Sequence, residues 1–450
     1  MARHTHQPAT SATQYMTLRF ALILLIFLLS LATSADRAPN NCPDAWMPRS
    51  TAPSLVDGMG VNIHFTDPRP GEIKMIADSG FRWVRMDFKW DATERDRGRY
   101  DFSGYDRLLA ALDQHNIHAL LILDYGNPLY DNDGPPRTEI ARQAFARWAV
   151  AAAKHFAGRG VIWEIYNEPN NSMFWPSQPN VNEYIALALA VGRAFRSELP
   201  TEKLVGPATS GIDFPFLEAC FKAGLLDYWA AVSVHPYRQS DPENAANDYC
   251  RLREMISRYR ARTPRVGERA ENPIISGEWG YSSVWRGMSE EKQAALLARE
   301  MLTNLANGVP ISIWYDWRDD GVDPKEAEHH FGIVRNAYQD GRDSVFEPKP
   351  AYQAAKTVSQ FVDGYAYQRR LPVDSDSDYV LVFSRGDEVR IAAWTTTTAS
   401  HRVFIPIKEG QFTITKHTGE NAGSTSSSPQ GLELTITAAP IYLTRQSTGR

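Results

Sequence analysis

Two glutamates in this chain stand directly after short apolar runs, where side chains emerge at the edge of a buried element. Glu168 follows the run Val161–Tyr166 in an Asn-Glu-Pro motif. Glu278 follows the run Pro273–Gly277 and precedes a tryptophan. Two carboxylates that face one another across a cleft can divide acid, base and nucleophilic roles between them. The cleavage of a glycosidic bond needs such a pair.

In that reaction one carboxylic acid protonates the leaving oxygen, while the other carboxylate attacks the anomeric carbon or activates water. A separation of about 5–5.5 Å between the groups implies retention of configuration, and about 6.5–9.5 Å implies inversion. A carboxylate in such a position can also be a helix cap or a salt-bridge partner. We predict that Glu168 and Glu278 are catalytic, and we expect the charge of Glu278 to raise the pKa of Glu168.

The elements that must position this pair are short apolar runs that alternate with stretches of helical spacing. There are eight runs: Gly60–His64, Phe81–Asp87, Ala119–Asp124, Val161–Tyr166, Leu204–Pro207, Ala231–His235, Pro273–Gly277 and Pro310–Tyr315. This alternation predicts an α/β fold, a (β/α)₈ TIM barrel. A doubly wound sheet would usually carry a Gly-rich loop after its first strand, and none follows here. Alternation along the seventh strand directs Ile274, Ser276 and Glu278 to one side, so we expect Glu278 to face the barrel mouth.

The C-terminal part of the chain has a different pattern. From residue 366 to 447, short alternating or β-branched runs are separated by Gly, Asp and Ser turns, which predicts a small antiparallel β-sandwich domain. Within it, the serine-rich stretch Ser424–Ser428 is predicted to be a loop. Residues 58–365 form the predicted catalytic barrel.

The N-terminus predicts export. Phe20–Leu31 is an apolar run with small residues after it, so we interpret residues 1–35 as a signal peptide and 36–57 as a lead-in segment. The run is shorter than the roughly 20 apolar residues of a membrane span, although an uncleaved anchor is the alternative. The expected location is therefore secreted or periplasmic.

Composition excludes several other classes of protein. A formal net charge of −5 argues against general affinity for nucleic acid, which needs basic patches. No cofactor or metal is expected, because the adjacent Glu328, His329 and His330 lack the spacing that directs two histidines to one ion. Cys220 and Cys250 are candidates for one disulfide. The oligomeric state cannot be inferred.

The positions of the two glutamates resemble those of the clan A glycoside hydrolases, the "4/7" barrels. In that clan, the Glu after Asn on strand four is the acid/base and the Glu on strand seven is the nucleophile. The resemblance covers residues 58 to about 363 and implies these roles for Glu168 and Glu278. It also implies five substrate-binding residues: Asn167 at the sugar 2-hydroxyl, Arg85 beside the nucleophile at the end of strand two, His235 and Tyr237 after strand six, and the sugar-platform Trp314 on strand eight.

Two of these assignments have structural alternatives. Arg85 could pair only with Glu164, one layer below the barrel mouth, and His235 could be a buried histidine of the core. Five other aromatic side chains could be sugar platforms or could pack their own loops: Phe174, Trp175, Trp279, Tyr281 and Trp317.

Within the clan, the chain resembles family 39-type enzymes, which include exopolysaccharide endoglycosidases, and family 5-type cellulases. The implied function is retaining hydrolysis of β-linked O-glycosidic bonds in a polysaccharide or oligosaccharide. Aromatic loops after strands three, four and eight favour internal cleavage. An exo-acting β-glycosidase and a transglycosylase are alternatives on the same site, and a non-catalytic carbohydrate-binding barrel is an alternative of another class.

Overall fold

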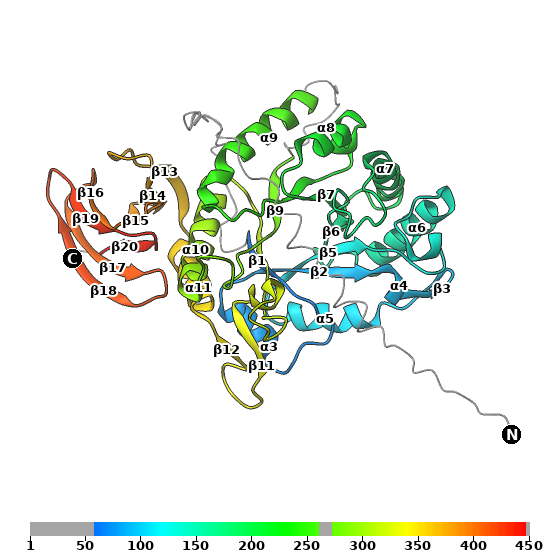
Figure 1. Cartoon of the computed structure of the whole chain (residues 1–450), viewed down its shortest axis with the longest axis horizontal. Helices are drawn as coiled ribbons and strands as arrows, with labels where there is room; N and C mark the ends of the chain where they lie inside the picture. Colours follow the sequence, from blue (N-terminus) through cyan, green and yellow to red (C-terminus); the bar gives the residue numbers. More distant parts are fainter. Residues whose placement is uncertain (1–57, 261–271, 447–450) are drawn as a thin grey trace. The chain divides into compact units, whose positions relative to one another are not determined.

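The computed structural model describes residues 58–260 and 272–446. Eight parallel strands close into a barrel in the order β1-β10-β9-β8-β7-β6-β5-β2 (Figure 1). They are β1 (Met59–Asn62), β2 (Trp83–Lys89), β5 (His118–Asp124), β6 (Ile162–Ile165), β7 (Lys203–Ser210), β8 (Ala231–His235), β9 (Ile274–Trp279) and β10 (Ser312–Trp314). Each predicted apolar run overlaps one of these strands, so the predicted barrel is confirmed. The predicted signal peptide and lead-in segment lie outside the described residues.

Helices connect successive barrel strands, and one more follows the last strand. The longer connecting helices are α3 (Glu72–Asp78), α5 (Ser103–Asp113), α6 (Glu139–His155), α7 (Val181–Glu198), α8 (Phe214–Lys222), α9 (Ala245–Arg260) and α10 (Glu290–Ala306), and α11 (Pro350–Val362) follows β10. Side-chain caps fix several starting points: the Thr138 hydroxyl accepts from Ala141 N at α6, and the Ser289 hydroxyl accepts from Lys292 N at α10. Among the described residues, no helix has both the length and the apolar character that a membrane span needs.

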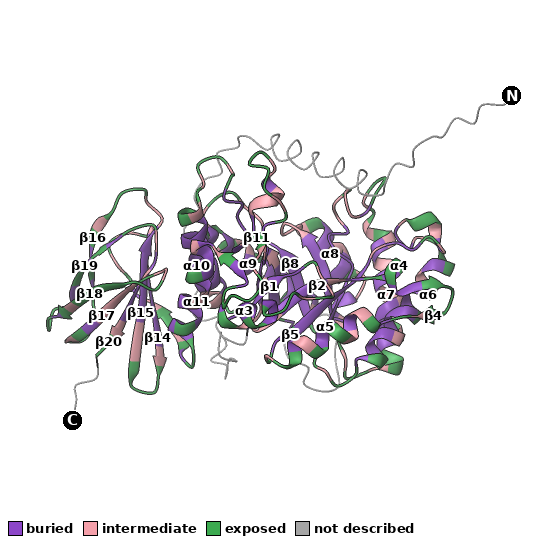
Figure 2. Ribbon diagram, turned by 90° about the horizontal axis from the view of Figure 1, so that it is seen from below, coloured by how far each residue is buried: buried purple, intermediate pink, exposed green. Residues whose placement is uncertain are grey.

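Strand register separates the barrel interior from the layer beneath the helices. Arg85 pairs with Leu120, and Leu120 pairs with Ile162, so these neighbours point to the same side. Leu120, Ile162 and Ile275 belong to a small interior cluster, whereas Ile274 belongs to the larger core between strands and helices. The strands are accordingly among the most buried elements (Figure 2). The polar side chains of the interior therefore lie at the mouth of the barrel, above a layer of apolar side chains.

Antiparallel strands follow the barrel. One sheet has the order β13-β14-β15-β20-β17-β18, and β16 pairs with β19. Their bounds are β13 (Ala366–Arg370), β14 (Asp378–Arg385), β15 (Glu388–Thr395), β16 (His401–Ile405), β17 (Gly410–Lys416), β18 (Asn421–Ser427), β19 (Leu432–Ile436) and β20 (Ile441–Arg445). An apolar cluster that includes Val380, Ile391, Val403 and Leu434 fills the space between the two sheets, as in a sandwich.

One secondary-structure prediction in this region was wrong. The stretch Ser424–Ser428, predicted to be a loop, lies largely in the edge strand β18, which pairs with β17. Six of the seven β18 side chains are exposed or half-buried, so the strand carries no apolar alternation by which the sequence could reveal it.

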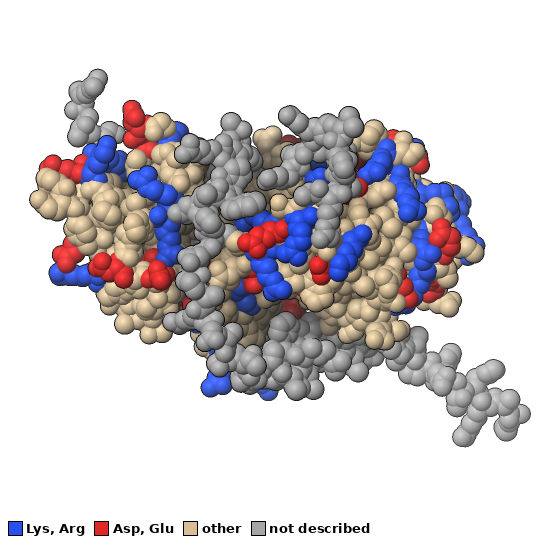
Figure 3. All heavy atoms as spheres, turned by 90° about the horizontal axis from the view of Figure 1, so that it is seen from above, with Lys and Arg blue, Asp and Glu red and all other residues tan. Residues whose placement is uncertain are grey.

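The predicted disulfide between Cys220 and Cys250 was wrong. Cys220 is a free, buried cysteine and Cys250 is disulfide-bonded, so the two are not bridged to one another. On the face seen in Figure 3, basic and acidic side chains are intermixed over the described surface.

Candidate active site

Glu278 reaches the barrel mouth through an irregularity in β9. Ser276 pairs with Ser312 and Trp279 pairs with Trp314, so one extra residue lies on β9 between these two pairs. Ile275 faces the barrel interior and Ile274 faces the helices, which reverses the alternation expected from sequence. The bulge restores the direction of Glu278, because an extra residue turns the following side chain to the other face.

A close approach of neighbouring side chains requires glycine at the base of this bulge. A Cβ atom at Gly277 would overlap the Ser233 hydroxyl and would lie 3.2 Å from Glu164 Oε1. The glycine therefore lets strand β9 carry Glu278 past a crowded interior layer.

Glu168 projects from a turn with unusual backbone angles just beyond β6. Tyr166 and Glu168 have φ angles of 64° and 44°, a left-handed conformation that is uncommon for residues other than glycine. The Glu168 amide donates to Ala208 O on β7 at 3.0 Å, which holds the turn in place. Such conformations persist only where surrounding contacts enforce them, and they concentrate at functional sites.

Arg85 joins most of the predicted site residues. Its fully buried guanidinium donates to Glu164 Oε2 at 2.7 Å and to Glu278 Oε2 at 2.5 Å. The same group donates to Asn167 Oδ1 at 2.8 Å and contacts His235 Nε2 at 3.1 Å. The two alternatives for Arg85 are therefore both realised, since one side chain pairs with Glu164 below and with Glu278 at the mouth.

The contact with Arg85 determines which nitrogen of His235 carries a proton. A guanidinium only donates, so His235 Nε2 must accept from it. The proton then lies on Nδ1, which donates to Glu168 Oε1 at 2.9 Å. His235 is completely buried, and it links the guanidinium at one end of its ring to the second glutamate at the other.

The pKa of Glu168 is lowered, contrary to the expectation from sequence. Burial acts to raise this pKa, but hydrogen bonds from His235 and Asn171 outweigh it. Asn171 Nδ2 donates to Glu168 Oε2 at 2.9 Å, so both carboxylate oxygens accept hydrogen bonds. The expectation failed because it counted the charge of Glu278 and not these donors, which stabilise the ionised carboxylate.

Two further donors hold Glu278. The Tyr237 hydroxyl donates to Glu278 Oε1 at 2.9 Å, and Asn62 Nδ2 at the end of β1 donates to Oε2 at 3.2 Å. One carboxylate oxygen of Glu278, one of Glu168 and a ring nitrogen of His235 all lie within 4.8 Å of one another. The structure thus brings together six of the seven predicted site residues: Glu168, Glu278, Asn167, Arg85, His235 and Tyr237.

Trp314 is not brought into this group. Its side chain is fully buried, its ring lies 6.2 Å from that of Tyr281, and its indole donates to Phe331 O at 3.3 Å. Ile313 of β10 and Ile311 just before the strand point inward, so alternation directs Trp314 outward. The next residue, Tyr315, is half-buried, and the charge of Glu278 acts on it, which places its side chain at the mouth.

The other aromatic candidates divide in the same way. Trp175, Trp279, Tyr281 and Trp317 are buried and pack their loops. Phe174 is half-buried and stacks on Tyr125, which follows β5, with ring centroids 5.8 Å apart. The charges of Asp87 and Arg85 act on Tyr125. The stacked pair of Tyr125 and Phe174 therefore borders the mouth of the barrel, on the side of β5 and β6.

Sequence reasoning missed Asn62 and the residues that surround Tyr315. His64 Nε2 lies 3.3 Å from Asp316 Oδ2, and Glu328 Oε2 accepts from the Tyr315 hydroxyl at 3.4 Å. Asn62, His64 and Asp316 all follow strand ends, which is the one signal that could have selected them. Glu328 lies in a connecting segment, and its neighbours His329 and His330 contact Asp323 and not Glu328.

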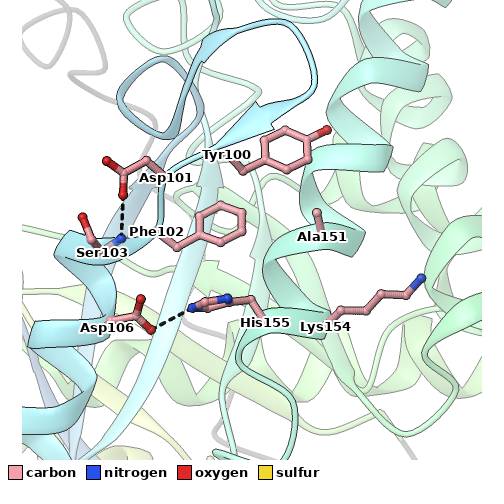
Figure 4. A pocket seen from close by; sticks show the side chains of 8 residues that line it. All are labelled: Tyr100, Asp101, Phe102, Ser103, Asp106, Ala151, Lys154 and His155. Carbon is pink, nitrogen blue, oxygen red and sulfur yellow. Dashed lines mark hydrogen bonds and ion pairs between the residues drawn. The ribbon is translucent and has the colours of Figure 1, made fainter.

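A separate hollow lies on the outside of the barrel between α5 and α6 (Figure 4). It is lined by Tyr100, Asp101, Phe102, Ser103, Asp106, Ala151, Lys154 and His155, with an ion pair between His155 and Asp106 at 2.8 Å. None of the site residues above lines it, so it is distinct from the candidate active site.

The sequence matches a family model, and the fold matches known structures. Residues 56–320 match the model described as cellulase, glycosyl hydrolase family 5. No curated protein sequence matches the chain. A family 39 glycoside hydrolase from the gut symbiont Bacteroides cellulosilyticus WH2 superimposes with a TM-score of 0.73 at 24% identity, over 87% of this chain and 81% of that one.

Two other structures extend the comparison. A GH39 β-xylosidase from Caulobacter crescentus has a TM-score of 0.61 at 16% identity, over 88% of this chain and 97% of that one. A GH30 endoxylanase from Clostridium papyrosolvens C71 has a TM-score of 0.62 at 12% identity, over 89% of this chain and 98% of that one. At these identities the structural likeness establishes the shared fold, a barrel followed by β-strands.

Proposed function

Because the chain belongs to the cellulase family, glycosyl hydrolase family 5, we propose that it cleaves β-linked polysaccharides within the chain, with Glu278 as nucleophile and Glu168 as acid/base. Family membership makes it a glycosidase of the retaining clan A type. The single observation that carries the proposal of a retaining mechanism is the distance of at most 4.8 Å between carboxylate oxygens of Glu168 and Glu278. That spacing suits direct attack on the sugar and leaves little room for an intervening water.

In the first step Glu278 attacks the anomeric carbon while Glu168 gives its proton to the leaving oxygen. Arg85, Asn62 and Tyr237 each hydrogen-bond to Glu278, which fixes its carboxylate for attack. A covalent glycosyl–enzyme forms, and the charge of Glu278 is lost.

In the second step Glu168 takes a proton from the incoming water, and the bond between the sugar and Glu278 breaks. The hydrogen bonds from His235 and Asn171 stabilise ionised Glu168, the form that acts as base. Because Arg85 occupies Asn167 Oδ1, the amide NH₂ of Asn167 is the group that would donate to a sugar oxygen.

The proposal of internal cleavage rests on where half-buried aromatic side chains lie. Tyr125 and Phe174 border one side of the mouth, and Tyr315 lies at the β10 side with its ring 5.3 Å from that of Phe331. Trp285 packs against the same Phe331 ring and is also half-buried. Aromatic faces on both sides of the two carboxylates suit stacking of sugars on either side of the cleaved bond.

Substitution of each glutamate tests the roles. Glu278→Ala should abolish hydrolysis of aryl β-glycosides, and added azide should restore turnover and give a glycosyl azide of inverted configuration. Glu168→Ala should keep activity only on substrates whose leaving group needs no proton. Activity of Glu278→Ala equal to that of the parent would show that the assignment is wrong. Viscosity and product length on a soluble β-glucan distinguish internal from terminal cleavage.

A further inference from the structure

Five carboxylates besides the proposed catalytic pair surround the same opening. Two lie on the neighbouring strands β2 and β5, two follow β10, and one lies in the short helix η7 (Ala327–His330). We call this group the acidic rim; its members are Asp87, Asp124, Asp316, Asp320 and Glu328. Parallel barrel strands end at one face, so Asp87, Asp124 and Asp316 gather there, and Asp320 lies beside Asp316.

Contacts connect the rim to the nucleophile. His64 Nε2, Asp316 and Asp320 offer ligand atoms that lie within 4.8 Å of one another. The charges of Glu278, Asp320 and Asp316 all act on Glu328. The charges of Asp316, Asp320 and Asp87 likewise act on His64. The rim is thus a continuous part of the wall beside Glu278.

Several rim oxygens are buried and have no hydrogen-bond donor. Asp124 is completely buried and neither of its oxygens has a donor in hydrogen-bonding geometry, while burial, followed by the neighbouring Asp87 carboxylate, raises its pKa well above the usual range. Asp316 Oδ1 is also buried without a donor, although Oδ2 of the same group contacts His64. A buried acceptor without a donor costs about 1–3 kcal/mol, so these oxygens point to a ligand that supplies donors.

Few cations offset the rim. Lys89 Nζ lies 3.9 Å from Asp87 Oδ2, and His64 contacts Asp316. Arg85 already forms ion pairs with Glu164 and Glu278. Burial, followed by the charge of Glu278 and of rim neighbours, raises the pKa of Glu328 to about 8. Burial likewise raises the pKa of Asp316 to about 7. Below these values the two groups are protonated, and a bound cation would favour their ionised form, which a neutral hydroxyl cannot do.

We propose that the acidic rim selects a substrate with a free ammonium group, so that the polysaccharide contains an amino sugar that is not N-acylated. The inference rests on the proposed function, because it places the cationic sugar next to the cleaved bond. An ammonium group supplies both the positive charge and up to three donors for the buried oxygens. A metal ion fits less well, because it would need neutral His64, whereas Asp316 outweighs burial and raises the pKa of His64 to about 9.

Three hexasaccharides with the same β-1,4 backbone test the proposal: the glucosamine hexamer, its fully N-acetylated counterpart and cellohexaose. They differ only in an ammonium, an acetamido or a hydroxyl group. Binding is measured calorimetrically to the Glu168→Gln protein at pH 6, with 0.15 M NaCl and EDTA. The measurement is repeated after Asp320→Asn and Glu328→Gln together, which keep side-chain shape and remove two rim carboxyl groups. Asp323→Asn with Glu326→Gln, in the same connecting segment, is the matched control for net charge.

We expect the glucosamine hexamer to bind at least about tenfold more tightly than cellohexaose, as for a partly buried ion pair. The rim variant should lose this preference and the control should keep it. The proposal is overturned if cellohexaose or the acetylated hexamer binds equally well, if the glucosamine hexamer does not bind, or if both variants behave alike. Binding of the hexamer that requires added Ca²⁺ would also overturn it, in favour of a metal site. Hydrolysis of cellohexaose by the parent without any preference would leave the proposed function standing and remove only this inference.

Discussion

The hydrogen bond from Asn171 to Glu168 leads to a specific prediction about pH dependence. Asn171 Nδ2 donates to Glu168 Oε2 and is one of the interactions that lower the pKa of Glu168. Because the bond stabilises the ionised carboxylate, its removal must favour the protonated form. Glu168 has to be protonated to act as acid, so Asn171→Ala should extend activity to higher pH.

The size of the effect follows from the strength of the bond. A hydrogen bond to a charged group contributes about 1.5–3 kcal/mol, and the lower value is appropriate because Asn171 is half-exposed. At a pH well above its pKa, the protonated fraction of Glu168 should therefore increase by about tenfold, since about 1.4 kcal/mol is a factor of ten. The value of kcat/KM on the alkaline side should rise by the same factor relative to its maximum.

The assay is the pH profile of kcat/KM on an aryl β-glycoside with a poor leaving group. Asn171→Asp is the second variant, because its retained oxygen can still accept from Met173 N, as Asn171 Oδ1 does at 3.1 Å. It also adds a negative charge, so its descending limb should lie at higher pH still. A dinitrophenyl glycoside, which needs no acid, should show no such shift. Identical descending limbs for the parent and both variants would refute the role of Glu168 or this account of its pKa.

Three other predictions concern packing and buried charge. Gly277→Ala should lower kcat by about tenfold or more, because its Cβ would overlap the Ser233 hydroxyl; Ser233→Ala in the same chain should recover much of the loss, which steady-state kinetics can check. Glu300 is buried with both oxygens unpartnered, and burial raises its pKa well above 4.5. Above pH 4.5 the unfolded chain loses a proton that the folded chain keeps, so stability falls; Glu300→Gln should therefore match the parent at pH 4 and be the more stable in urea at pH 7. Trp394→Phe should lower the free energy of unfolding by about 1–3 kcal/mol with KM unchanged, because the Trp394 indole donates to buried Glu243.

The sequence predicted the barrel because its signals are local and repeated. Each of the eight strands is an apolar run, and the strand ends delivered Glu168, Glu278, His235 and Tyr237 to one face. Arg85, expected at the end of its strand, lies inside β2 and reaches the same face through its long side chain. The same kind of signal failed for β18, where few side chains are buried and only backbone pairing defines the strand.

Side-chain direction was harder to predict than strand position. Glu278 faces the mouth as expected, but the expected reason was wrong, since Ile275 and not Ile274 points inward and a bulge corrects the direction. On β10 no irregularity compensates, so Trp314 is outward and Tyr315 takes the place at the mouth. A shift of one residue exchanges the two faces of a strand, and hydrophobicity does not distinguish them where both are buried.

The pKa of Glu168 was mispredicted because it depends on a relay between distant residues. Arg85 touches Glu278 across 193 positions of sequence and His235 across 150. Through its donor to His235 Nε2, it also sets the proton that His235 presents to Glu168. One guanidinium thus stabilises the charge of the nucleophile and, through an imidazole, that of the acid/base. A lysine at position 85 would keep the charge but not the fork of donors, so it would leave at least one of these two glutamates without its support.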